Sequence, residues 1–127
     1  FTKIGLLPDS GGTWLLPRLA GRQRALGLAL LGDKLPAADA EAMGLIWRCL
    51  PDAGFDLTVA DMAAKLAAMP TGALVATRSA IDAAQHLSFG ESLALEAREQ
   101  KALGSSHDYL EGVAAFMAKR APVFTDR

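Results

Sequence analysis

The chain has 127 residues, of which 51% are hydrophobic, and its formal net charge is −1. This length allows one modest hydrophobic core, so we expect one domain or part of one. The near-zero net charge gives no general attraction to nucleic acid or to an anionic membrane. A single cysteine, Cys49, excludes an internal disulfide and a cysteine-rich metal site, and is consistent with a reducing, cytoplasmic compartment.

The start of the sequence indicates a part of a longer polypeptide. It reads Phe-Thr-Lys-Ile-Gly, without an initiator Met and without the basic and apolar regions of a signal peptide. The longest strongly apolar stretch, Ala25 to Leu31, is far shorter than the roughly 20 residues that span a bilayer. We therefore expect no membrane segment.

Apolar clusters alternate with arginines between Gly11 and Gly32. Proline disrupts a helix interior and glycine favours a helix end, so Pro17 and Gly21 predict two short helices joined by a bend. The next helix has Pro36 in its first turn and Gly44 as its C-terminal stop.

The segment from Leu45 to Leu50 is the one convincing strand candidate. It reads Leu-Ile-Trp-Arg-Cys-Leu, is rich in β-branched and aromatic residues, and is closed by Pro51 and Asp52. The segment is too short to form a sheet by itself.

Helical spacing dominates after Asp52. Four apolar residues repeat at positions 0, 3, 4 and 7 of one helix face, namely Val59, Met62, Ala63 and Leu66. The next predicted helix opens near Pro70 and places Leu74 and Ile81 seven residues apart.

Two more helices complete the chain. Ser88 and Glu91 fit a capping box, which predicts a helix that runs to about Leu103. A last amphipathic face comprises Leu110, Val113, Ala114 and Met117, and we expect Pro122 to end that helix.

These elements predict a mainly α chain with a short β-strand. A strand-bearing segment, residues 1–52, precedes an all-helical segment, residues 53–127. The apolar helix faces carry Ala and Met but few large aromatics, so the helical segment needs a neighbouring surface to bury itself fully. We therefore expect a homo-oligomer.

Four segments, in the right order, resemble the C-terminal half of the crotonase (enoyl-CoA hydratase/isomerase) superfamily. They are Ile-Gly-Leu-Leu-Pro-Asp-Ser-Gly-Gly-Thr at 4–13, Ala-Leu-Leu-Gly-Asp-Lys-Leu at 29–35, Ala-Asp-Ala-Glu-Ala-Met-Gly-Leu at 38–45, and Glu-Gly-Val-Ala-Ala-Phe-Met-Ala-Lys-Arg-Ala-Pro-Val-Phe at 111–124. The resemblance covers essentially the whole chain.

The fold implied by this resemblance is an α/β spiral of ββα turns followed by C-terminal helices that build a trimer or a hexamer. Residues 1–52 would form the end of the spiral core, and residues 53–127 the helical trimerisation segment. The family's two oxyanion-hole N–H donors belong to the N-terminal half of the fold, which we expect as a partner. Coenzyme A would be part of the substrate, and no separate cofactor is implied.

Within the superfamily, the chain most resembles the ring-epoxide isomerases of aerobic phenylacetate breakdown. This resemblance rests on Phe1-Thr-Lys-Ile-Gly, Asp9, Gly-Gly-Thr-Trp-Leu-Leu-Pro-Arg from Gly11, and Gly-Leu-Ile-Trp from Gly44. Asp9 matches the catalytic aspartate of isomerase relatives, where typical hydratases have glycine. Phe1 matches the position of the second glutamate of hydratases, and a phenyl group cannot activate water.

The resemblance assigns Asp9 the role of proton shuttle. A carboxylate in a partly apolar pocket can take a proton near the thioester and return it elsewhere. The alternative is that Asp9 is a turn residue or N-cap before Gly11 and Gly12. The two glycines either let the backbone approach a ligand or give a strand-to-helix turn its flexibility.

The same resemblance implies six substrate-binding residues: Leu7, Pro8, Gly12, Trp14, Phe116 and Lys119. Phe116 would lie near the adenine and Lys119 near a phosphate of the CoA of an adjacent subunit. The alternatives are a core phenylalanine and a solvated lysine at a helix C-terminus. Trp14 either faces an aromatic acyl group or, as is more usual for a tryptophan in an apolar helix, packs in the core.

Other reactive residue types are interpreted structurally. The arginines at 18, 22 and 24 form a solvated helix face rather than a phosphate site. His86 and His107 are surface residues without metal-ligand spacing, and Cys49 is a small buried hydrophobe.

These inferences predict an acyl-CoA isomerase, with the ring-1,2-epoxide of phenylacetyl-CoA as substrate and oxepin-CoA as product. The enzyme alternatives are an enoyl-CoA hydratase and a Δ3,Δ2-enoyl-CoA isomerase. A third alternative is a non-catalytic oligomerisation module, because the oxyanion hole, which contributes several kcal/mol to such reactions, is not in this chain.

Overall fold

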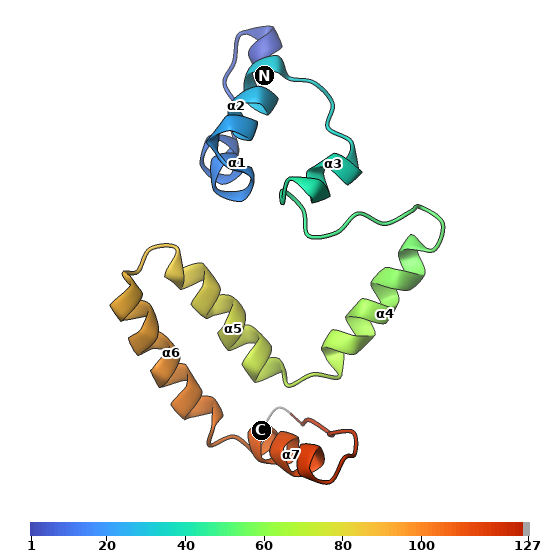
Figure 1. The fold of residues 1–127 in the computed structure, drawn as a ribbon, viewed down its shortest axis with the longest axis vertical. Coiled ribbons are helices and arrows are strands. Elements are labelled where there is room, and N and C mark those ends of the chain that lie inside the picture. The colour runs from blue at the N-terminus through green and yellow to red at the C-terminus, as the bar shows by residue number, and fades with distance from the viewer. Residues whose placement is uncertain (126–127) are drawn as a thin grey trace. The chain divides into compact units, whose positions relative to one another are not determined.

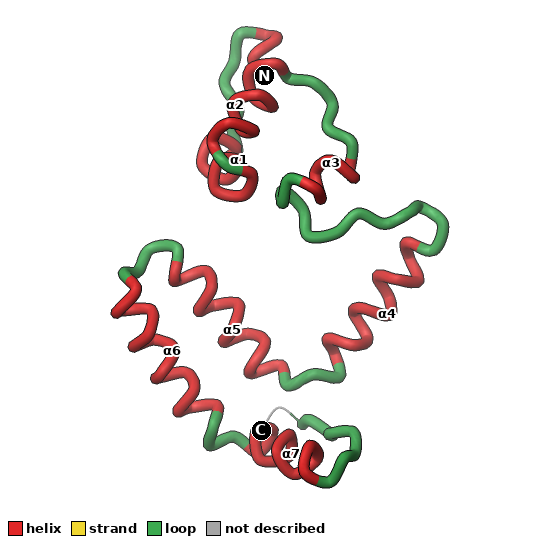
Figure 2. The backbone as a smooth tube through the Cα atoms, in the orientation of Figure 1, coloured by secondary structure: helices red, strands yellow, loops and turns green. Residues whose placement is uncertain are grey.

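The computed structural model describes residues 1–125, and every regular element in that range is a helix (Figures 1 and 2). The elements are a 3₁₀ helix η1 (Thr2–Ile4) and the α-helices α1 (Gly12–Ala20), α2 (Arg22–Leu31), α3 (Ala37–Ala42), α4 (Phe55–Ala67), α5 (Thr71–Ala84), α6 (Phe89–Leu103) and α7 (His107–Met117). The chain forms two compact units, residues 1–55 and the residues from Asp56 onward.

The first unit is built on the packing of α1 against α2. Gly21 separates the two helices with a φ of 81°, a conformation that glycine adopts without steric cost. The buried residues of the pair are Ala20 and Ala25, whose small side chains allow the helices to approach closely. The bend predicted at Gly21 is therefore present.

The prediction that Pro17 also divides this region is wrong, because Pro17 lies inside α1. A proline ring removes one N–H donor and crowds the preceding turn, but it does not prevent its own carbonyl from bonding onward. The Pro17 carbonyl accepts the Gly21 N–H at 3.1 Å, so the helix continues to Ala20.

The N-terminal turn η1 is attached to the C-terminal end of α2. The Thr2 hydroxyl donates to the Ala29 carbonyl at 2.8 Å, and Lys3 Nζ lies 3.2 Å from Asp33 Oδ1. These contacts fix the start of the segment that leads to Asp9.

Helix α3 ends as its glycine predicts. Gly44 has a φ of 78°, its N–H donates to the Glu41 carbonyl, and the Leu45 N–H donates to the Ala40 carbonyl, both at 2.9 Å. This pair of bonds is the Schellman motif, which satisfies the last carbonyls of a helix.

The strand predicted from Leu45 to Leu50 is wrong: this segment is bent, and no strand occurs in the described chain. A strand requires a neighbouring backbone to bond with. Here α3 takes two of the donors instead, because the Leu45 N–H bonds to Ala40 and the Cys49 N–H donates to Glu41 Oε2 at 3.0 Å.

In the second unit, α5 and α6 pack side by side as a helical hairpin (Figure 1). The capping box predicted at the start of α6 is present: the Ser88 N–H donates to Glu91 Oε2 at 2.8 Å, and the Glu91 N–H donates to Ser88 Oγ. The helix ends at Leu103, as predicted.

Helix α7 ends at Met117, before the predicted stop at Pro122. The Lys119 N–H donates to the Phe116 carbonyl at 3.2 Å and the Arg120 N–H to the Ala115 carbonyl at 3.1 Å, which is a second Schellman motif. Lys119 occupies its left-handed position, with a φ of 51°. The chain therefore reverses several residues before the proline.

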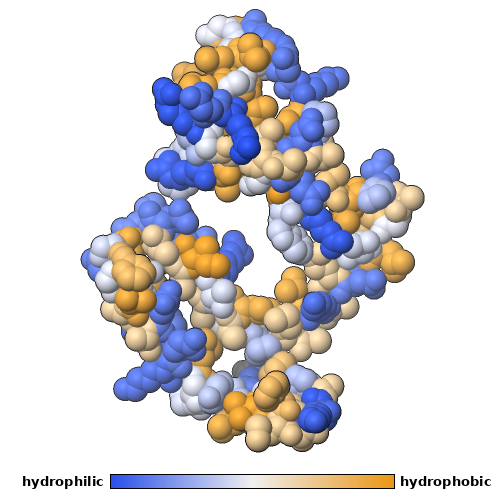
Figure 3. All heavy atoms as spheres, viewed as in Figure 1, coloured by the Kyte–Doolittle hydropathy of each residue, from blue (hydrophilic) through white to orange (hydrophobic). Residues whose placement is uncertain are grey.

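Little large apolar surface is buried in either unit. In residues 1–125 the buried residues are four alanines and Asp108, and many large apolar side chains are exposed (Figure 3). No single described helix is long and apolar enough to cross a membrane, although α4 and α5 taken together pass that test with a bend of 104° between them.

Candidate functional site

Asp9 begins a tight turn that leads into α1. Its carbonyl accepts the Gly12 N–H at 2.8 Å, and the two residues between them, Ser10 and Gly11, have φ values of 52° and 82°. Positive φ at both central positions is typical of a type I′ turn. Ser10 takes this conformation at a steric cost that a glycine would not incur.

Gly12 brings the start of α1 close to Pro8. A Cβ atom at Gly12 would lie 3.3 Å from the Pro8 Cβ, which is tighter than ordinary van der Waals contact. The absence of a side chain at Gly12 thus lets the segment before Asp9 approach the helix. The structure brings Pro8, Asp9 and Gly12 together in one turn.

The Asp9 side chain does not cap α1. The N-cap residue of α1 is Gly11. Asp9 contributes its backbone carbonyl to the preceding turn. Asp9 is exposed, and so is Leu7 two residues before it, at 71%. The carboxylate is therefore accessible to a ligand, and of its two structural alternatives the N-cap is wrong.

Trp14 lies in the first turns of α1 and is 43% exposed, so within this chain it is not a core residue. The guanidinium carbon of Arg18 lies 3.8 Å from the centroid of its ring, and Arg18 Nη1 donates to the Trp14 carbonyl at 3.0 Å. This cation–π contact covers one face of the indole. Arg18, Arg22 and Arg24 are all exposed, as a solvated face requires.

A second group of candidate residues lies at the end of α7, in the other unit. Phe116 is 82% exposed, so it is not a core phenylalanine of this chain, and Lys119 is exposed in the Schellman turn. Phe116 and Met117 line a groove of about 560 Å³ together with Pro70, Tyr109 and Phe124. Its lining is predominantly apolar, which suits an aromatic ring or a hydrocarbon chain.

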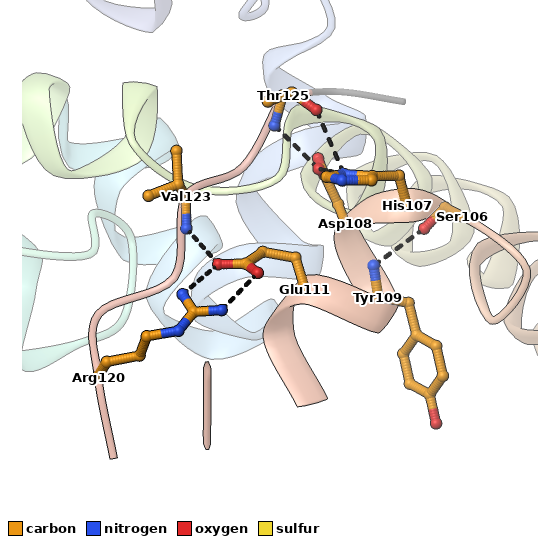
Figure 4. A network of polar contacts seen from close by, with 8 residues as sticks. All are labelled: Ser106, His107, Asp108, Tyr109, Glu111, Arg120, Val123 and Thr125. Atoms are coloured by element: carbon orange, nitrogen blue, oxygen red, sulfur yellow. Dashed lines mark hydrogen bonds and ion pairs between the residues drawn. The ribbon is translucent and has the colours of Figure 1, made fainter. Parts of the chain in front are cut away.

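A polar network fastens the residues after α7 to that helix (Figure 4). Arg120 forms a two-pronged ion pair with Glu111: Nη1 lies 2.6 Å from Oε1, and Nη2 lies 2.7 Å from Oε2. The Val123 N–H also donates to Glu111 Oε1, at 2.8 Å. The hydrogen bonds from Arg120 and then from the Val123 N–H lower the pKa of Glu111 from 4.5 to about 2.

Asp108 provides a second attachment point. It is 6% exposed, it accepts the Thr125 N–H at 2.9 Å, and it lies 3.3 Å from Nδ1 of the exposed His107 (Figure 4). The Ser106 hydroxyl caps α7 by accepting the Tyr109 N–H at 3.1 Å. Asp108 thus secures the far end of the segment that Glu111 secures in the middle.

A family comparison decides what kind of protein contains these two groups. The model of the enoyl-CoA hydratase/isomerase family matches residues 1–127. The chain belongs to this family. The turn at Asp9 and the C-terminal run from Glu111 to Phe124 are therefore parts of an enoyl-CoA hydratase/isomerase sequence.

Two curated relatives have different names. The chain is 48% identical to the 1,2-epoxyphenylacetyl-CoA isomerase of Escherichia coli K12 and 49% identical to a probable enoyl-CoA hydratase of Rhodobacter capsulatus, each over all 127 residues. It covers 48% and 49% of their lengths. The chain thus spans about half the length of the curated relatives it matches.

Solved structures agree with this family membership. A putative enoyl-CoA hydratase/isomerase from Mycobacterium abscessus superposes with a TM-score of 0.92 at 36% identity, over 100% of this chain and 49% of that one. The fold of this family member is therefore similar to that of about half of the Mycobacterium abscessus protein.

Sequence reasoning missed the polar network of this family member. Glu111 and Arg120 belong to the segment at 111–124 that resembles the family, but residues nine apart are not neighbours on one helix face. Their contact depends on the reversal of the chain at Lys119. The described chain contains no cluster of three or more His, Cys, Asp or Glu suited to a metal. His86 and His107 are exposed as predicted, and Cys49 is half-buried.

Proposed function

We propose that this chain is the C-terminal half of an acyl-CoA isomerase, in which Asp9 moves a proton between two positions of the substrate. The observation that carries the proposal is the Asp9 turn, in which an exposed carboxylate that does not cap the helix stands beside the strained Ser10. Strained backbone conformations cluster at functional sites.

The proposed substrate is the ring-1,2-epoxide of phenylacetyl-CoA, converted to oxepin-CoA. The 48% identity to a 1,2-epoxyphenylacetyl-CoA isomerase supports it, and so does Phe1, which cannot activate water as a glutamate does. The 49% identity to a probable enoyl-CoA hydratase keeps hydration as the second candidate.

The residues of the first unit would have two roles, proton transfer and binding of the acyl group. Asp9 would accept a proton near the thioester and return it, and the oxyanion-hole donors would come from the N-terminal half of the fold. Trp14, which stacks on Arg18, would lie near an aromatic acyl group, with Leu7, Pro8 and Gly12 beside it.

The residues of the second unit would bind coenzyme A. Phe116 supplies an exposed aromatic ring for adenine and Lys119 an exposed ammonium for a phosphate. In the proposed assembly, a homotrimer or hexamer in the cytoplasm, this contact would be to the CoA held by an adjacent subunit.

The test is Asp9→Asn in the full-length protein, assayed with a panel of CoA thioesters: the phenylacetyl ring epoxide, a trans-2-enoyl-CoA and a 3-enoyl-CoA. We expect turnover to fall about 10²- to 10⁴-fold, as for the loss of a general acid–base. Asp82→Asn, at an exposed ion pair with Arg78 on α5, is the matched control and should keep normal turnover. Near-normal turnover by the Asp9 variant would overturn the assignment, and the preferred thioester separates isomerase from hydratase.

A non-catalytic oligomerisation module is the other candidate. Its support is that the chain covers about half of its relatives while exposing many large apolar side chains. Sedimentation of the 127-residue chain alone, followed by a thioester assay, tests it: a stable trimer without turnover would favour it.

A further inference from the structure

The segment after α7, residues 118–125, is secured along its length rather than free. Arg120 and Val123 bond to Glu111, and Thr125 bonds to Asp108 (Figure 4). Between these bonds, the Phe124 ring approaches Gly112, where a Cβ atom would lie 3.7 Å from Phe124 Cε1. Helix α7 therefore holds a C-terminal strap, residues 118–125, and Glu111 accepts three hydrogen bonds from this strap.

Lys119 lies at the point where this strap leaves the helix. Its φ of 51° belongs to the left-handed region, which glycine usually occupies at this position of a Schellman motif. A non-glycine residue is held there at a steric cost. The contact that follows immediately in the chain is the ion pair between Arg120 and Glu111, so the backbone of Lys119 is fixed between the helix end and that ion pair.

The ion pair also determines which of the two adjacent cations, Lys119 or Arg120, can bind a ligand. Both nitrogens of the Arg120 fork are bonded to the Glu111 carboxylate, whose side chain is only 16% exposed. Lys119 is exposed and forms no ion pair within the described residues. Of two adjacent positive charges, one is neutralised and the other faces solvent.

The Glu111 pair differs from an ordinary surface ion pair in this chain. Arg98 and Glu99 are 71% and 35% exposed and pair along the surface of α6. Glu111 adds a backbone N–H to a two-pronged contact, and its low pKa, about 2, keeps it charged throughout the neutral range. Glu111 is therefore an anion that bonds to Arg120 and to the Val123 N–H at once.

We propose that Glu111 is a positioning residue for coenzyme A: by holding Arg120 and the strap, it fixes Lys119 in the left-handed turn and makes Lys119 the cation that meets a CoA phosphate. This inference rests on the proposed function, which assigns Lys119 to CoA. Glu111 itself would not touch the ligand.

The experiment compares two substrates of the full-length protein, a CoA thioester and the pantetheine thioester of the same acyl group, which lacks every phosphate. The measured quantity is the ratio of their kcat/KM values. We expect Glu111→Gln to lower this ratio about five- to tenfold through KM for the CoA thioester, with kcat unchanged, as for the loss of one charged contact. Glu99→Gln makes the same charge change at a surface pair and should leave the ratio unchanged.

Three further variants separate the explanations. Lys119→Ala should lower the ratio to the same extent, and the double variant should fall no further, because both changes remove one interaction. Glu111→Asp keeps the charge and should restore part of the ratio. If Glu111→Gln fails to fold by circular dichroism, Arg120→Lys, which keeps the charge but loses the fork, takes its place with the same expected fall.

Each outcome has one meaning. A normal ratio in Glu111→Gln beside a lowered ratio in Lys119→Ala overturns the positioning role and leaves the CoA contact intact. A normal ratio in Lys119→Ala overturns the CoA contact of the proposed function. Equal losses with both thioesters in Glu111→Gln would show a purely structural role, which also overturns the proposal.

Discussion

Ser10 and Lys119 are the two non-glycine residues of the described chain with positive φ. One follows the candidate proton shuttle Asp9, and the other is the candidate phosphate contact. Left-handed backbone costs roughly 1–2 kcal/mol for a residue with a Cβ. Strained backbone conformations cluster at functional sites, so the positive φ of Ser10 and Lys119 supports a functional role for these two turns.

Lys119→Gly tests whether this strain is present. We expect the substitution to raise the free energy of unfolding by about 0.5–1 kcal/mol, because the relief of the left-handed cost exceeds the extra flexibility of the unfolded chain. Lys119→Ala removes the same charge but keeps the Cβ, so it should change stability little. Urea denaturation of both variants measures the difference, and a less stable glycine variant would contradict the prediction.

The pH dependence of the ion pair between Glu111 and Arg120 follows from the pKa of Glu111. Hydrogen bonds from Arg120 and the Val123 N–H lower that pKa from 4.5 to about 2. A carboxyl group whose pKa is depressed on folding stabilises the fold fully above its unfolded value, and this contribution disappears as the pH falls through its folded value. The contribution of Glu111 is therefore constant above pH 4.5 and is lost between pH 4.5 and 2.

The measurement is the difference in Tm between the wild type and Glu111→Gln as a function of pH. We expect a constant difference from pH 8 to about pH 5, and a difference that shrinks toward pH 2. A difference that vanishes already at neutral pH would show that the ion pair does not persist in solution.

At the scale of the element, the start of α6 depends on a single side chain pair. Ser88 Oγ accepts the Glu91 N–H, and Glu91 Oε2 accepts both the Ser88 N–H and, at 2.6 Å, the Ser88 hydroxyl. The side-chain hydrogen bond from Ser88 is the main reason why the pKa of Glu91 is lowered.

Ser88→Ala is expected to destabilise the protein by about 1 kcal/mol, the usual cost of a lost N-cap. Thr77→Ala is the matched control, because the Thr77 hydroxyl donates to the Ala73 carbonyl within α5 and caps nothing. The control should be nearly neutral. Denaturation curves compare the two, and equal effects would show that the capping box contributes nothing beyond a surface hydroxyl.

Helix ends were predictable because their chemistry is local. Ser88 with Glu91, and Gly44 after α3, each act within a few residues of the backbone they satisfy. The prediction of a strand at 45–50 was wrong because strand pairing is a non-local property. An apolar β-branched segment forms a strand only beside a second extended segment. In the described chain the Cys49 N–H instead bonds to Glu41.

The candidate site likewise has a part that the sequence predicts and a part that it does not. Asp9, Pro8 and Gly12 are close in sequence, so a turn motif predicted their proximity. Glu111 and Arg120 meet only because the chain reverses in a left-handed conformation at Lys119, a residue whose type does not favour it. No residue pattern in the sequence predicts that reversal.

At the scale of the whole molecule, the described residues bury too little apolar surface to account for a stable fold. The buried apolar residues are Ala20, Ala25, Ala40 and Ala115, whereas Phe89, Trp47 and Phe116 are 81%, 78% and 82% exposed. Folding must offset the conformational entropy of the chain mainly by burying large apolar groups. We therefore expect other polypeptide surface to cover these exposed side chains.

This argument predicts different behaviour for the 127-residue chain alone and for the full-length protein. The isolated chain should bind the dye ANS strongly and self-associate, because large apolar side chains remain uncovered. The full-length protein should bind little dye, since the proposed N-terminal half and neighbouring subunits would cover them. Dye fluorescence with light scattering measures both, and a dye-free monomer of 13.3 kDa would show that the chain needs no further surface.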